Sequence, residues 1–335
     1  MVAIMKKIIF FLSLISCTSA FAQNNKCLKK IQSVLTTPSQ LYLFKNHPKI
    51  QKLFKLGCKK TDYGDSLYTT DAYVFIHEAA HFEDLKVNYN KSPKKTSESD
   101  QTENFNLYTV NNEHIGNFQS YKNLPKVKDL IRPYLKKERP DLLKEDSPFI
   151  GLHSGYIGDD QSMAADVIQG IATELNGYTH GAIIQSSVLP KVPKRILESD
   201  GKGGKIWVDN MHAKLDQTYG VMYFIYNLNL YLKLLKENHP EIWKEFYTDY
   251  NKNYLKKLLS PSIETLKSLN YCNLLKEDVG VNVWKFYVEL LKGDDLKILE
   301  EVLGKPQINK LICAEDSLKM GLKFLEEKKI LNLCD

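Results

Sequence analysis

Apolar residues in this 335-residue chain recur mostly with a helical spacing, and only locally with the alternation of a strand. Steps of three and four place side chains on one face of a helix, whereas steps of two place them on one face of a strand. The helical spacing is clearest after the capping residues Asp159 and Asp160, and it predicts a long helix over 160–180. The apolar stripe of this helix consists of Met163, Ala164, Val167, Ile168, Ile171, Ala172 and Leu175.

Alternation is confined to a short part of the chain before that helix. Residues 105–110 (Phe-Asn-Leu-Tyr-Thr-Val) predict a strand, and residues 115–118 are placed to pair with it. Residues 149–157 are a further candidate strand. The sequence therefore predicts a small strand-rich insert within a helical protein.

Proline, glycine and polar residues divide the remaining segments. Residues 126–143 predict short helices that are interrupted at Pro133 and Pro140. Residues 88–104 are polar, have no apolar period and predict a mobile loop. The glycines in 201–204 predict a flexible joint before a largely helical carboxyl-terminal part.

The predicted fold class is mainly α (α+β), with a helical carboxyl-terminal lobe. The expected divisions are a signal peptide over 1–22, a helical segment over 23–66, a catalytic region over 67–200 and a helical region over 201–335. The apolar stretch 221–235 is interrupted by Asn227, Asn229 and Lys233. It predicts a buried core helix, and no segment after the amino terminus predicts a transmembrane span.

The amino terminus resembles a secretory signal. Lys6 and Lys7 precede an apolar run, and Ala20-Phe21-Ala22 is a small-x-small cleavage site. A second interpretation is that residues 14–17 form a bacterial lipobox, which would leave a lipid anchor on Cys17. Both interpretations predict an extracytoplasmic protein, either periplasmic or secreted.

Charge and cysteine content agree with that location. The formal net charge of +6 includes Lys6 and Lys7 and comes mainly from dispersed lysines, so nucleic-acid binding is not predicted. Cysteines in an oxidising compartment favour disulfides, and Cys27 with Cys58 is one candidate pair. The other cysteines of the mature chain are Cys272, Cys313 and Cys334.

Residues 77–81 read His-Glu-Ala-Ala-His and carry the strongest chemical signal. The helical spacing of 71–86 places His77 and His81 on one face, one turn apart, where both can bind one metal ion. Glu78 lies beside them and can accept a proton from a metal-bound water. This is the zincin arrangement, and it predicts a Zn²⁺ site.

Zinc at a catalytic site takes three protein ligands, so a third ligand must come from elsewhere in the chain. The metzincin pattern has a glycine and a third histidine after the second histidine, and Asp84 and Val87 stand at those positions, which excludes that pattern. Glu174 borders the apolar stripe of the helix over 160–180 and is the leading candidate. Asp216 is the alternative, because Asp216-Gln217-Thr218-Tyr219-Gly220 resembles part of the aspzincin motif.

The pairing of His77, Glu78 and His81 with Glu174 resembles the gluzincins, which are zinc peptidases with a glutamate ligand on a second helix. The resemblance covers two short motifs and implies a zincin-like core and hydrolysis of peptides or proteins. It implies Glu78 as the general base. A non-catalytic envelope binding protein and a zinc hydrolase of non-peptide amides are alternatives.

Other polar residues are candidates for assisting roles at the site. Tyr219 follows the candidate ligand Asp216 and is a second candidate catalytic residue. Tyr178 lies one turn after Glu174 and is expected to orient a ligand, as is His212. His153 and His180 are weaker candidates of the same kind.

Overall fold

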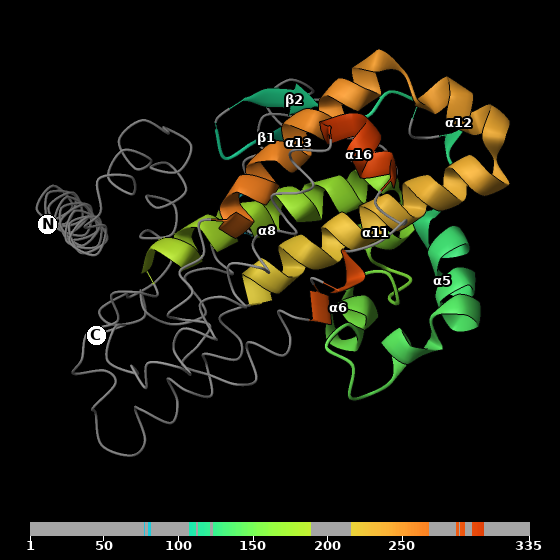
Figure 1. Cartoon of the computed structure of the whole chain (residues 1–335), viewed down its shortest axis with the longest axis horizontal. Coiled ribbons are helices and arrows are strands. Elements are labelled where there is room, and N and C mark those ends of the chain that lie inside the picture. Colours follow the sequence, from blue (N-terminus) through green and yellow to red (C-terminus); the bar gives the residue numbers. More distant parts are fainter. Residues whose placement is uncertain are drawn as a thin grey trace, which may run out of the picture.

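A computed structural model describes residues 77, 80–81, 107–111, 113–120, 123–188, 216–267, 286–287, 289–291 and 297–304. These residues are mainly helical, as predicted (Figure 1). The predicted signal peptide, segment 23–66, loop 88–104 and glycine joint lie outside the described residues, as do all the cysteines. No helix of the described residues is long and apolar enough to cross a membrane.

Three long helices form the centre of the described structure. Helix α8 (Ile168–Val188) packs against α11 (Asp216–Asn238) and against α13 (Asp249–Lys267); α8 and α11 run across the middle of Figure 1, and α13 lies above them. Helix α11 is buried on nearly all its faces between 217 and 235. A helix surrounded in this way belongs to the interior, so the core helix predicted over 221–235 is confirmed.

The helix predicted over 160–180 is divided in two. Helix α7 (Met163–Asp166) begins at Ser162, whose hydroxyl accepts a hydrogen bond from the backbone N–H of Ala164, and ends at Val167. Val167 has an extended backbone, so α7 turns back against the start of α8. Gly170 leaves room there for the carbonyl of Met163. The prediction of one continuous helix was wrong because the apolar stripe continues through this break.

The predicted strand pair is confirmed in shorter form. Strands β1 (Leu107–Tyr108) and β2 (His114–Gly116) form an antiparallel hairpin beside α8 and α13. The side-chain amide of Asn176 donates to the carbonyl of Tyr108 over 3.1 Å. The side-chain oxygen Oε1 of Gln169 accepts from the backbone N–H of Phe118 over 3.0 Å. These buried bonds attach the hairpin to the helix that also carries Glu174.

Two local predictions before α7 were wrong. Helix α5 (Val127–Glu138) continues through Pro133, which lies on the exposed face where water can reach the unpaired carbonyl. The candidate strand 149–157 is helix α6 (Ile150–Gly155). Phe149 and His153 stack in the core with their ring centroids 5.5 Å apart, a spacing of four that fits a helix.

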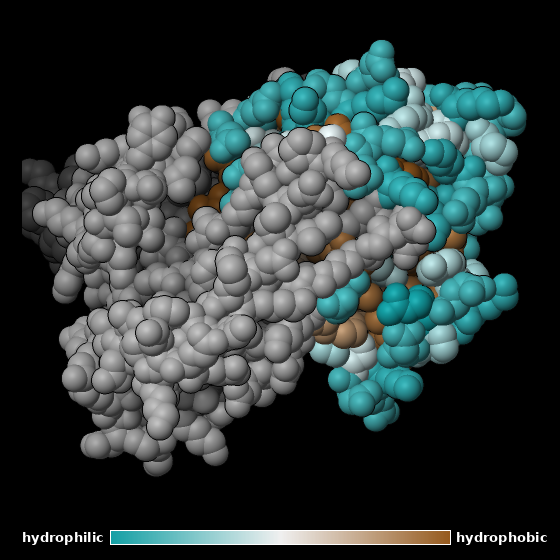
Figure 2. Space-filling view, viewed as in Figure 1, coloured by the Kyte–Doolittle hydropathy of each residue, from teal (hydrophilic) through white to brown (hydrophobic). Residues whose placement is uncertain are grey.

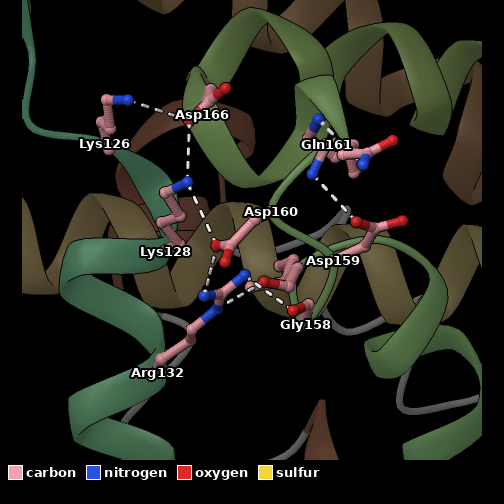
Figure 3. Close-up of polar contacts among 11 residues, drawn as sticks. Lys126, Lys128, Arg132, Gly158, Asp159, Asp160, Gln161 and Asp166 are labelled. Carbon is pink, nitrogen blue, oxygen red and sulfur yellow. Dashed lines mark hydrogen bonds and ion pairs between the residues drawn. The ribbon is translucent and has the colours of Figure 1, made fainter.

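Shorter elements complete the described part. They are the 3₁₀ helix η4 (Pro140–Leu143), α12 (Pro240–Phe246) and α16 (Lys297–Leu303). Figure 3 shows Arg132 of α5 reaching Asp160 and the carbonyl of Gly158, at 2.8 Å each. These bonds join α5 to the turn before α7. Hydrophilic residues cover most of the described surface on the face seen in Figure 2.

Candidate metal centre

His77 and His81 bring their ring nitrogens together on one side of a helical turn. Residues 77, 80 and 81 are helical, and the Nε2 atoms of the two histidines lie 2.9 Å apart. Oε2 of Glu174 lies 3.2 Å from Nε2 of His77 and 3.4 Å from Nε2 of His81. Helix α8 therefore presents the carboxylate to both imidazoles.

These separations fit a single small metal ion. Zinc bonds of 2.0 to 2.2 Å in tetrahedral geometry place ligand atoms about 3.3 to 3.6 Å apart. The two distances to Glu174 lie close to that range, and the distance between the two imidazole nitrogens is somewhat shorter. His77, His81 and Glu174 thus form a group that could hold a metal ion.

The buried carboxylate provides a second test of this fit. Oε2 of Glu174 is buried and accepts no hydrogen bond of good geometry from the described residues. A buried carboxylate oxygen needs a hydrogen-bond donor or a positive charge beside it. A cation held among the three ligand atoms would supply that charge, so the group could hold a metal ion.

The charge state of Glu174 suits a metal ligand. Burial raises the pKa of its carboxyl group, but the neighbouring imidazoles of His77 and His81 lower it more, and the resulting pKa is about 2 against an ordinary 4.5. The carboxylate is therefore ionised at neutral pH. The group then offers one anionic oxygen and two imidazole nitrogens.

Tyr178 contacts this group through its ring. The centroid of the Tyr178 ring lies 4.3 Å from that of His77, with the planes at 79°. Its hydroxyl shares a hydrogen bond of 2.8 Å with the hydroxyl of Tyr156 at the end of α6. Tyr178 is thus placed to hold the His77 ring in position.

The other predicted site residues have different outcomes. Tyr219 is buried and stacks on Tyr287, with ring centroids 5.8 Å apart. Glu78 and His212 lie outside the described residues. Asp216 is the first residue of α11, and its side chain is also outside the described part, so the structure does not compare it with Glu174 as a ligand.

The two weaker histidine candidates lie in the core. Nδ1 of His153 is 3.5 Å from the hydroxyl of Tyr223, and burial, followed by the charge of Arg132, lowers the pKa of His153 to about 4. Nδ1 of His180 bonds to the carbonyl of Asn176 at 2.8 Å. His153 therefore packs as a neutral core residue.

Two residues at the site were missed by the sequence analysis. Gly177 lies against both imidazoles, and Tyr156 bonds to Tyr178. Gly177 lies three positions after Glu174, and this helical spacing could have identified it. Nothing in the sequence distinguishes Tyr156 from the many other tyrosines.

Comparison with known proteins identifies no relative, since no family model, curated protein or solved structure matches the chain. The function of the chain is therefore inferred from the residues of the site.

Proposed function

We propose that this protein is a zinc-dependent peptidase of the gluzincin type, in which His77, His81 and Glu174 bind Zn²⁺. One observation carries the proposal: the three ligand atoms lie within 4.8 Å of one another. Two imidazole nitrogens and one carboxylate are a ligand set of catalytic zinc sites, which leave a fourth position for water. His77 and His81 of the first motif and Glu174 of the second would together supply the three protein ligands of such a zinc site.

Bound zinc would polarise a substrate carbonyl and lower the pKa of a water molecule. Glu78 follows His77 in the sequence and is the proposed general base. Its carboxylate takes the proton of the attacking water and delivers it to the leaving nitrogen. Tyr178 holds the His77 ring, Tyr219 is the second proposed catalytic residue, and His212 is proposed to orient a ligand.

The proposed setting is extracytoplasmic, because the amino terminus resembles a secretory signal. The proposed substrate is a peptide or a protein. A zincin-like core around α8 and the helix of His77 belongs to the same proposal. The observation in its support is that a carboxylate from a second helix meets the two histidines.

Metal content and peptide hydrolysis of the purified full-length protein test the proposal. We expect one zinc ion per chain, and we expect Glu174→Ala to lose it. Glu78→Gln should retain zinc while hydrolysis of a peptide library collapses. Asp216→Asn is the matched carboxylate control and should retain both bound zinc and peptide hydrolysis.

Three results would contradict parts of the proposal. Absence of bound zinc in the wild-type protein would contradict the proposed metal site. Full zinc affinity in Glu174→Ala would contradict the assignment to the gluzincin type. Zinc binding without hydrolysis of any peptide would favour the non-catalytic binding protein.

A further inference from the structure

Gly177 lies where α8 passes closest to the two metal-binding histidines. A methyl group at this position would stand 3.0 Å from both Cε1 and Nε2 of His81, and 3.2 Å from Cε1 of His77. Side-chain carbons rarely approach other heavy atoms this closely. One of the crowded atoms, Nε2 of His81, is also a proposed ligand atom.

The backbone does not explain a glycine here. Gly177 lies inside α8, and the described glycines with a left-handed backbone are Gly116 and Gly304. Alanine favours a helix interior more than glycine does, so helix formation alone would select alanine. The remaining reason for glycine is the space that the imidazoles occupy.

One of the crowded rings, that of His77, has little room to move away. The ring of His77 meets Tyr178 on another side at 4.3 Å, and it meets the His81 ring at 4.6 Å. His77 itself is 3% exposed. A side chain at 177 would therefore move the rings relative to Glu174, which is only one turn away on α8.

We propose that Gly177 is a positioning residue of the metal centre. Its missing side chain lets α8 approach until Glu174 and the two imidazoles reach one ion. This inference rests on the proposed metal function. Sites of this kind tolerate displacements of only about 0.5 Å, so the methyl group of alanine is enough to disturb them.

The chain offers two kinds of matched control. A methyl group at Gly151 or Gly155 in α6 would meet nothing within 4 Å. A methyl group at Gly181, one turn after Gly177 on α8, would meet the side chain of Gln217. Gly181→Ala thus disturbs the packing of α8 on α11, and the nearest atoms to its methyl group belong to Gln217 rather than to the imidazoles.

Metal affinity of the full-length protein is the first test. Chelator competition with Zn²⁺ should show a loss of about tenfold to a hundredfold for Gly177→Ala. The visible spectrum of the Co²⁺-substituted protein should change in this variant. It should stay as in the wild type for Gly155→Ala and Gly181→Ala, whatever their thermal stability. Wild-type affinity and an unchanged Co²⁺ spectrum in Gly177→Ala would overturn the inference.

A double-mutant cycle without metal covers the case in which Gly177→Ala folds poorly. If the methyl group acts through the His81 ring, its destabilising effect should be smaller or absent in a His81→Ala background. An equal loss of melting temperature in both backgrounds would overturn the inference. Failure of the wild type to bind metal would instead overturn the proposed function, so the two failures are distinguishable.

Discussion

The hydroxyl oxygens of Tyr156 and Tyr178 lie 2.8 Å apart and share a hydrogen bond between the end of α6 and the middle of α8. This bond restrains the phenol group of Tyr178, whose ring meets His77 edge to face. It thereby connects the candidate metal centre to an element that carries none of the three candidate ligands.

Tyr178→Phe removes the hydroxyl and keeps the ring, so it distinguishes the contribution of the hydrogen bond from that of the ring contact. We expect it to lower the free energy of unfolding by about 0.5 to 1.5 kcal/mol through loss of the hydrogen bond. Zinc affinity should change little, because the ring contact with His77 remains. Tyr178→Ala should cost about 3 to 5 kcal/mol and weaken zinc binding at least tenfold. Urea denaturation and chelator competition measure the two effects, and equal zinc affinity in both variants would contradict the role of the ring.

Metal removal should lower the stability of the protein. A ligand at a hundred times its Kd stabilises the folded state by about 2.7 kcal/mol, so chelation should lower the melting temperature. Glu174→Gln should abolish this zinc-dependent shift, because it removes the charged ligand. Glu113→Gln is a suitable control, since Glu113 pairs with Lys257. A shift of wild-type size in Glu174→Gln would show that zinc acts elsewhere.

Gly220→Ala should loosen the packing of α11 on α8. A methyl group there would overlap the ring of Tyr178, whose neighbours include Phe224 at a centroid distance of 5.4 Å. Overpacking of this kind costs about 1 to 3 kcal/mol. Thermal and urea denaturation measure the loss, with Gly155→Ala as the control in open space. Unchanged stability of Gly220→Ala would mean that α8 and α11 can accommodate a methyl group at this position without cost.

His153 should make stability depend on pH in a defined range. Burial lowers its pKa to about 4, from an ordinary 6.5. The unfolded chain therefore binds a proton before the folded protein does, and stability falls as the pH drops from about 6.5 to 4. The loss approaches about 3 kcal/mol and ends below pH 4, where both states are protonated.

His153→Gln isolates that contribution, because glutamine does not titrate. Urea denaturation at a series of pH values should give a flatter profile for the variant between pH 6.5 and 4. Parallel profiles for the two proteins would show that His153 is not buried in its neutral form.

Some elements followed from local sequence alone. The core helix around 221–235 and the strand pair near 107–116 were predicted because their apolar periods extend over several residues. One of the wrong predictions has a local cause as well. Residues 149–157 contain apolar residues at both strand and helix spacings, and the core contact of Phe149 with His153 selects the helix.

The candidate site was predictable to a similar extent. The sequence by itself determined that His77 and His81 share a helix face, because the spacing of four acts within one turn. Only the tertiary structure decided which distant residues meet them. It brings Glu174 to within 3.4 Å of both rings and places Gly177 against them. Contacts of this kind depend on how closely helices approach one another, and that distance is set by packing of the whole core rather than by any local period.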